Sequence, residues 1–336
     1  MYDPAGLDAA PRVRIALLGS ALEEIADVEH LDGGRLPRMI AGLRWWAGGG
    51  FRRIDAVYVE TSTVVASPFD VVFLAWSRFR KRPVGIYFRD AYQLHRDLFP
   101  IERRRQLVAD FAWRATLPVL RRVATVRFAP SAGLADVLGL RDAVLLPPGT
   151  DPSLPDLGVP ATHLVAAVVA PTKAAGFEVL RAALEIIRRE IPDARLRVIT
   201  SVHPAAALPD WIEVVPGDRP MLAALLTAAR VVVIPVPLNR YGQLAVPVRL
   251  ADLVAFGKPI VVTDSTATRA FLRGDEVALL SVDTAEGLAA AISRLLLDDG
   301  LAMALAARAR AFAEAPESTW GNRAATVVEQ LVGRAA

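Results

Sequence analysis

The chain has 336 residues, of which 53% are hydrophobic and 22% are charged, a composition that indicates two folded domains and excludes an intrinsically disordered protein. It contains no cysteine, so disulfides, thiolate metal sites and cysteine nucleophiles are excluded. No two of its four histidines stand at the spacing of a helical metal site, so a metal site built from histidines is not expected. We expect no cofactor and no metal.

Charge is distributed unevenly along the chain. Residues 1–150 carry 21 Lys and Arg against 16 Asp and Glu, whereas residues 151–336 carry 18 against 20. The basic half is interpreted either as a solvated, arginine-rich surface or as a surface that attracts an anionic membrane or an acidic acceptor. Nucleic acid is not an expected partner, because the basic runs are not interleaved with stacking aromatic residues.

The hydropathy of the chain gives no sign of a membrane span or a leader. Residues 1–14 lack an apolar stretch long enough for a signal peptide, and we interpret them as a loose tail. No run approaches the roughly twenty apolar residues that a spanning helix needs. We therefore expect a cytoplasmic protein, and the basic half leaves open a peripheral position at the inner face of the membrane.

Apolar runs alternate with helical stretches through the first half of the chain. The runs predict strands at Val13–Leu18, Ala56–Val59, Pro83–Phe88, Ala124–Phe128 and Ala143–Leu146. The predicted helices between them are Leu36–Trp46, Phe69–Arg80, Ile101–Arg122 and Ala132–Leu138. The third of these helices carries apolar residues among arginines, so it either faces the core or turns one face to lipid.

A proline-rich segment at residues 147–160 follows and predicts a linker. The alternation then restarts, with strands expected at His163–Val169, Leu196–Thr200, Ile212–Val215, Val231–Val236, Pro259–Val262 and Val277–Leu280. Helices are expected at 177–190, 285–297, 300–314 and 318–332. The last of these is expected to pack back on the N-terminal domain.

These patterns predict an α/β protein with two Rossmann-like, doubly wound parallel-sheet domains that face each other across a cleft. The expected domains are residues 1–150 and 151–336. Ligands of such sheets bind beyond the carboxyl ends of the strands.

The segment from Ala245 to Asp264, AVPVRLADLVAFGKPIVVTD, is the most informative of the chain. Pro247 suits the first position of a helix, and Gly257 suits its left-handed end. Arg249 and Asp252 are three residues apart and share a helical face. Arg249 falls in the first turn, beside the positive end of the helix dipole, which suits a phosphate.

This segment resembles the donor-binding segment of GT-B glycosyltransferases, particularly glycosyltransferase family four. In that family a helix commonly opens with Pro-x-Lys-x-x-Glu and ends in a Gly-x-Pro turn before a strand. The matching positions here are Pro247, Arg249, Asp252, Gly257 and Pro259. The resemblance extends to 129–131, 146–151, 170–177 and 275–332.

The resemblance implies a donor site in the C-terminal domain. It places Asp252 at the nucleotide ribose and Arg249 at the donor phosphates, with Thr172 and Lys173 reaching the diphosphate. The pattern departs at Leu244, where many members carry a second acidic residue, and at Ala170 and Ala175, where basic residues are usual. Polar groups close by are expected to substitute; the predicted donor-binding loop consists of Arg240, Tyr241, Gly242 and Gln243.

Candidate catalytic residues follow an apolar strand in the N-terminal half. Asp90 stands where the family has a His or Asp near the acceptor, and we expect it to orient or deprotonate the acceptor, with Arg89 beside it; alternatively, Asp90 caps the following turn. His95 is a further acceptor candidate or an ordinary packing residue. Gly19 and Ser20 would approach the sugar or the acceptor, or simply form a tight turn after the first strand.

The leading hypothesis is a glycosyltransferase that moves a sugar from a nucleotide-diphosphate sugar to an acceptor. The resemblance implies retention of anomeric configuration, independence of metal, and a place in bacterial-type carbohydrate biosynthesis. The acceptor is a small molecule, a lipid-linked glycan or a polysaccharide. Two alternatives stay open: a nucleotide-sugar epimerase or hydrolase of the same fold, and a two-lobed nucleotide-sugar-binding protein without catalysis.

Overall fold

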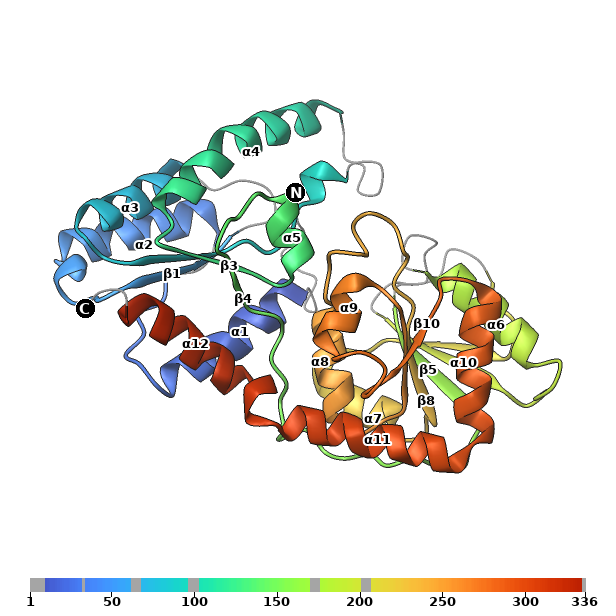
Figure 1. The fold of residues 1–336 in the computed structure, drawn as a ribbon. Helices are drawn as coiled ribbons and strands as arrows, with labels where there is room; N and C mark the ends of the chain where they lie inside the picture. Colours follow the sequence, from blue (N-terminus) through green and yellow to red (C-terminus); the bar gives the residue numbers. More distant parts are fainter. Residues whose placement is uncertain are drawn as a thin grey trace. The chain divides into compact units, whose positions relative to one another are not determined.

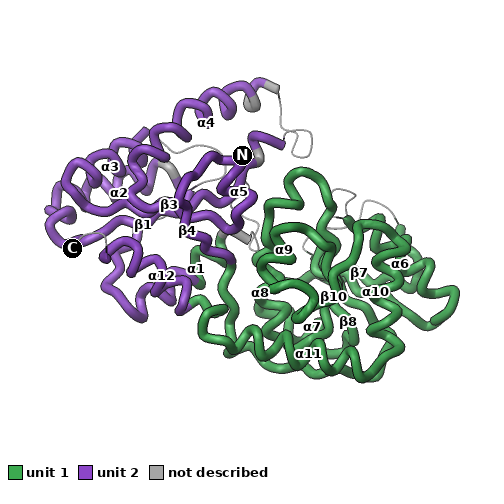
Figure 2. The backbone as a smooth tube through the Cα atoms, viewed as in Figure 1, with its two compact units in different colours: residues 1–17, 148–320 green, residues 18–147, 321–336 purple. Residues whose placement is uncertain are grey.

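A computed structural model describes residues 10–31, 34–61, 68–95, 103–169, 176–200 and 207–333. The chain forms two compact units, shown in separate colours in Figure 2. Unit 1 consists of Met1–Leu17 and Pro148–Trp320, and unit 2 consists of Leu18–Pro147 and Gly321–Ala336. The predicted division at 150/151 lies three residues from the point where the chain passes from unit 2 to unit 1. The two ends of the chain are exchanged, however, because Met1–Leu17 belongs to unit 1 and Gly321–Ala336 belongs to unit 2.

Unit 1 is built on a sheet that helices surround in Figure 1. The sheet has six strands in the order β10-β9-β8-β5-β6-β7, and every neighbouring pair is parallel. The strands are β5 (Leu164–Val168), β6 (Arg195–Ile199), β7 (Ile212–Val215), β8 (Val231–Ile234), β9 (Ile260–Thr263) and β10 (Leu279–Ser281). The helices are α6 (Phe177–Ile187), α7 (Leu222–Leu226), α8 (Val248–Ala255), α9 (Thr266–Phe271), α10 (Ala285–Leu297) and α11 (Asp299–Glu314).

Alternating side chains of the central strand enter two separate cores. Val165 and Ala167 of β5 pack with α6 and α10, whereas Ala166 and Val168 pack with α8 and α11. Helices therefore cover both faces of the sheet, which is why its strands are apolar on both sides. The order of strands reverses between β5 and β8, so unit 1 is doubly wound with a switch point at these two strands.

The end of α8 follows the predicted signal. Gly257 adopts a left-handed φ of 61°, and a Cβ there would lie 2.4 Å from Oδ1 of Asp156. We expect Gly257→Ala to lower the free energy of unfolding by more than about 1–2 kcal/mol, because left-handed strain adds to the clash. Gly158→Ala is the matched control, because Gly158 has a φ of 60° and no atom within 4 Å of its added Cβ. Urea unfolding measures both variants. Equal losses in the free energy of unfolding would show that the Asp156 side chain moves away from the added Cβ without cost.

Unit 2 contains a parallel four-stranded sheet with the sequential order β1-β2-β3-β4. Its strands are β1 (Val57–Glu60), β2 (Val84–Tyr87), β3 (Val126–Ala129) and β4 (Val144–Leu145). Its helices are α2 (Arg35–Ala47), α3 (Pro68–Phe79), α4 (Arg103–Val123) and α5 (Ala132–Val137). Val327 and Leu331 of α12 (Trp320–Val332) pack with β2 and β3, so the last helix covers part of this sheet.

The predicted strand at Val13–Leu18 is wrong, because these residues lie in helix α1 (Ala10–Glu23). The buried residues of α1 are Arg14, Leu18 and Ala21, a spacing of four and three that belongs to a helix rather than a strand. The Arg14 guanidinium lies 5.6 Å from the ring centroid of Trp320. A short apolar run fits both the two-residue period of a strand and the 3.6-residue period of a helix, and here packing along one helical face decides for the helix.

Among the helices that the structure describes, none combines the length and apolar character needed to cross a bilayer.

Candidate functional site

The carboxyl ends of β5 and β8 define the switch point of unit 1, where doubly wound sheets bind ligands. The loop after β5 contains Thr172 and Lys173, and these two predicted donor-binding residues lie outside the described residues, as do Ala170 and Ala175. Gly176, which precedes α6, has a φ of 77°, and a Cβ there would lie 2.7 Å from the carbonyl oxygen of Pro235. The start of α6 therefore packs closely against the loop that follows β8.

That loop is shaped by short-range hydrogen bonds. The Asn239 side-chain oxygen accepts from the backbone amides of Tyr241, at 3.0 Å, and Gly242, at 2.8 Å. A Cβ on Gly242 would lie 1.9 Å from the carbonyl oxygen of Pro237, so only glycine fits this turn. Arg240 is exposed at the tip, whereas Leu244, the position of the missing acidic residue, is buried.

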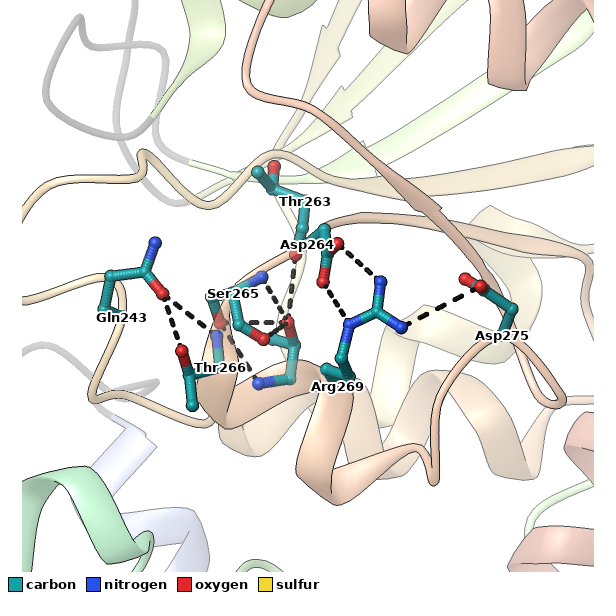
Figure 3. A network of polar contacts seen from close by, with 8 residues as sticks. Gln243, Thr263, Asp264, Ser265, Thr266, Arg269 and Asp275 are labelled. Atoms are coloured by element: carbon teal, nitrogen blue, oxygen red, sulfur yellow. Dashed lines mark hydrogen bonds and ion pairs between the residues drawn. The ribbon is translucent and has the colours of Figure 1, made fainter.

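Gln243 ties the loop to the start of α9, as Figure 3 shows. Its side-chain oxygen accepts from the amide of Thr266 at 3.0 Å and from the Thr266 hydroxyl at 3.1 Å. Ser265 caps α9 in a reciprocal capping box with Thr268. The Gln243 side chain therefore holds the loop in place through its carbonyl oxygen, a structural role that the sequence did not predict.

Helix α8 begins at the end of the same loop. Pro247 is its N-cap rather than its first residue, and no side chain caps it. Arg249, in the first turn, is half-buried. Its side chain lines a small depression, together with two acidic residues, a second arginine and three apolar residues: Asp218, Asp252, Arg219, Val13, Leu222 and Val248. The first turn of α8 thus combines the positive end of a helix dipole with a guanidinium.

Asp252 belongs to an ion-pair cluster centred on Arg219. Nε of Arg219 donates to Oδ1 of Asp252 at 3.0 Å, and Nη2 of Arg219 donates to Oδ2 of Asp151 at 2.8 Å. Burial raises the pKa of Asp252, whose side chain is only 5% exposed, although the Arg219 charge opposes that shift. Burial also acts to raise the pKa of Asp151, but hydrogen bonds from Ser153 and Arg219 outweigh it and lower that pKa.

Neither Arg219 nor the ion-pairing role of Asp151 was predicted from the sequence. Arg219 and Asp252 are 33 residues apart, and Arg219 and Asp151 are 68 apart, so no local spacing connects them. A signal for Arg219 did exist, because it follows the carboxyl end of β7 in the segment Gly217-Asp218-Arg219. Polar residues at that edge of a parallel sheet are candidates for ligand contact.

Arg219→Met is expected to leave the buried Asp252 carboxylate without its cation. We expect the free energy of unfolding to fall by about 2 kcal/mol, less than a fully buried pair would lose, because Arg219 is partly exposed. Nucleotide affinity should fall as well, whereas Arg219→Lys should recover part of both losses. Urea unfolding and calorimetric titration with UDP measure the two effects; unchanged values in Arg219→Met would show that Asp252 needs no partner.

In unit 2, Asp90 lies three residues after the end of β2, at the carboxyl edge of the sheet. Its side chain is 4% exposed, and Oδ2 faces Nε of Arg89 at 3.4 Å. Oδ1 is buried and, in the described part of the chain, has no hydrogen-bond partner. Burial raises the pKa of Asp90 to about 6, with Arg89 acting in the opposite direction.

The alternative that Asp90 caps the following turn is not supported, because neither oxygen of its carboxylate accepts a hydrogen bond from a backbone amide of the described residues. A buried carboxyl group with an unused oxygen and a raised pKa is instead typical of a functional site. His95, the further acceptor candidate, is buried within the same segment.

Gly19 and Ser20 do not follow a strand, because both lie within α1. Ser20 is exposed on that helix, and Gly19 approaches the ring of His30, since a Cβ added to Gly19 would lie 3.6 Å from Cε1 of that ring. The prediction that these two residues form a tight turn at a strand end is therefore wrong. It depended on the strand at Val13–Leu18, which does not form.

Comparisons with known proteins agree with this architecture. A family model described as glycosyl transferase-like matches residues 178–329, nearly all of them in unit 1. The predicted resemblance to GT-B glycosyltransferases, the α/β class with two parallel-sheet domains and the prediction of a glycosyltransferase enzyme all agree with this match and with the folds of the solved structures below. No curated protein sequence matches the chain.

Three solved structures illustrate the likeness. Sucrose-phosphate synthase from Thermosynechococcus elongatus has a TM-score of 0.62 at 18% identity, covering 93% of this chain and 90% of its own. HepE from Anabaena, in complex with UDP, has a TM-score of 0.62 at 15% identity, covering 88% and 82%. A putative UDP-N-acetylglucosamine 2-epimerase from Listeria monocytogenes has a TM-score of 0.54 at 15% identity, covering 97% and 94%. At these identities the likeness shows the fold.

Proposed function

We propose that the protein transfers a sugar from a nucleotide-diphosphate sugar to an acceptor hydroxyl, and that unit 1 binds the donor. The observation that carries the proposal is the first turn of α8, where Arg249 stands at the positive end of the helix beside Asp252. A helix N-terminus and a guanidinium are both suited to phosphate oxygens. The position belongs to the segment matched by the glycosyl transferase-like family.

Breaking the bond between sugar and phosphate leaves a nucleoside diphosphate that carries more negative charge than the donor. Arg249 and the amides of the first α8 turn would bind that growing charge more strongly in the transition state than in the ground state, which lowers the barrier. Asp252 would accept a hydrogen bond from the ribose. We propose that Asp90 orients or deprotonates the acceptor hydroxyl, with Arg89 keeping part of its carboxylate ionised.

We further propose that transfer retains the anomeric configuration, as the resemblance to glycosyltransferase family four implies, and that it requires no metal, because a guanidinium and helix amides can hold the diphosphate. Product anomers identified by NMR test the first statement, since an inverted product contradicts it. Full turnover after chelation with EDTA tests the second, and a loss restored by Mg²⁺ contradicts it. The protein is proposed to act in the cytoplasm and to contact an anionic membrane peripherally.

The test of donor binding is a thermal-shift screen with UDP, GDP, dTDP and ADP. HepE, with the same fold, was solved with UDP, so we propose UDP as the nucleotide of the donor. A ligand at one hundred times its dissociation constant adds about 2.7 kcal/mol to the stability of the folded state. UDP should therefore give the largest shift, and no shift with any of the four would contradict nucleotide binding by unit 1.

A second candidate is a nucleotide-sugar epimerase or hydrolase, because a putative 2-epimerase shares the fold over nearly the whole chain. Incubation with the UDP-sugar alone distinguishes the two, since an epimerase changes the sugar and a hydrolase releases it without an acceptor. A binding protein without catalysis would instead bind UDP and leave the donor intact with every acceptor. Buried Leu244, at the position of the missing acidic residue, is the observation that favours this third outcome.

A further inference from the structure

Helix α4 of unit 2 has two apolar faces. Ala109, Leu117 and Leu120 are buried, and they form the face that packs into the unit. On the opposite side Leu107 is 64% exposed, Val108 70% and Phe111 76%, the last being the most exposed of the large apolar side chains described. An ordinary surface helix is polar on the side that faces water, so this second face is unusual.

The exposed apolar residues lie on one side of the helix, with exposed Arg114, Ala115 and Pro118 between Phe111 and Val119. Leu107, Val108, Phe111 and Val119 recur at the spacing of one helical side. They span about 18 Å along the axis at about 1.5 Å per residue. We call these four residues the α4 stripe. Helices α3 and α4 contact each other and lie side by side over the sheet in Figure 1. Phe79, the last residue of α3, is also exposed.

Arginines border the α4 stripe at both ends and at its middle. Arg104, Arg114 and Arg122 are exposed on the same helix. Within its bounds α4 carries six arginines and a single acidic residue, Asp110. The guanidinium groups are spaced along the stripe rather than gathered on another face, so an occupant must combine an apolar interior with a negatively charged boundary.

From this arrangement we propose that the α4 stripe docks on the surface of an anionic lipid bilayer. Phe111, Leu107 and Val108 would enter the boundary between headgroups and acyl chains, with the helix parallel to the surface, and the three arginines would bind lipid phosphates. A second copy of the chain fits less well, because pairing two such faces would bring their arginines together. The inference gives the proposed peripheral membrane contact a defined surface.

Sedimentation with vesicles tests the proposal. The full chain should bind vesicles of phosphatidylcholine with about 30% phosphatidylglycerol and not those of phosphatidylcholine alone. The double variant L107E/F111E should lower the partition coefficient about tenfold or more, because two buried apolar side chains are lost. Neutralising Arg114 and Arg122 should lower it about fivefold per residue.

The matched control is L297E/M303E, which places two glutamates at exposed apolar positions of unit 1, 65% and 58% exposed, and should bind as the unaltered chain does. UDP-induced thermal shifts, measured on every variant, report on unit 1 and should not change, so failure of the membrane contact is distinguishable from failure of nucleotide binding. Absence of vesicle binding by the unaltered chain, or equal binding by L107E/F111E, overturns the proposal. The proposal is also overturned if light scattering detects a dimer of the unaltered chain that L107E/F111E abolishes, since a second copy of the chain then covers the α4 stripe.

Discussion

Arg249→Ala is expected to lower the affinity for UDP by about 10- to 100-fold, because a charge-assisted hydrogen bond to phosphate contributes about 1.5–3 kcal/mol. Glycosyl transfer should fall further than binding, since the lost contact strengthens as the leaving diphosphate gains charge. The fold should persist, because Arg249 is half-buried at the start of α8 and belongs to neither core of unit 1. Calorimetric titration with UDP and a transfer assay measure the two effects.

Arg294→Ala is the matched control for this variant. Arg294 is an exposed arginine on α10, which packs into the other core of unit 1, so its loss removes the same charge without touching the start of α8. Its UDP affinity and turnover should match those of the unaltered protein. An Arg249→Ala protein with unchanged UDP affinity would remove Arg249 from the donor site.

Asp90→Asn is expected to abolish most turnover, by about 10²–10⁴-fold, if the carboxylate acts as base. UDP binding by unit 1 should be retained. In the unaltered enzyme the rate should rise with pH through about 6, as Asp90 loses its proton. Asp55→Asn, at a carboxylate that is 87% exposed, is the control and should leave turnover unchanged. Near-normal turnover of Asp90→Asn would remove this residue from the mechanism.

The same substitution is expected to stabilise the protein at pH 8. The folded-state pKa of Asp90 is about 6 against an ordinary value of 3.8, so the folded state holds its proton over a range in which the unfolded chain has lost it. Stability attributable to this group is therefore present at low pH and lost as pH rises between these values. Asparagine does not ionise and therefore avoids that loss of stability, which is at most about 3 kcal/mol at 1.36 kcal/mol per pKa unit.

Urea unfolding at pH 8 and at about pH 4 separates this effect from a structural role. The increase in the free energy of unfolding of Asp90→Asn over the unaltered protein should be large at pH 8 and small at about pH 4. A loss of stability at both values would mean that the carboxylate holds the loop after β2 together, and that its burial serves structure rather than catalysis.

Local signals were sufficient for most of the fold. The start of α8 beside Pro247, its end at Gly257 and the strand that follows all depend on residues within a single segment, and the helix and strand form there. Two doubly wound domains were predicted because such segments repeat in a βα alternation, and the GT-B fold was predicted from the resemblance to glycosyltransferase family four. Helix α1 was predicted as a strand because its short apolar run fits either period, and packing of Arg14 and Leu18 along one face decides for the helix.

The candidate site was less predictable, because its contacts join distant segments. Arg249 and Asp252 follow from helical spacing, but the bonds from Arg219 to Asp252 and Asp151 depend on how the segment after β7, helix α8 and the linker come together. Likewise, the bond between Gln243 and Thr266 forms only when the loop after β8 meets the start of α9. The raised pKa of Asp90 depends on the burial of its side chain, which no sequence pattern predicts.

The central claim is that the first turn of α8 and Arg249 hold a diphosphate. The most direct measurement compares UDP with uridine in calorimetric titrations of the unaltered protein and of Arg249→Ala, because only UDP carries the phosphates. We predict that the affinity gap between UDP and uridine narrows by about tenfold or more in the variant, while uridine binding stays the same. An unchanged gap, or an equal loss for both ligands, would contradict the claim.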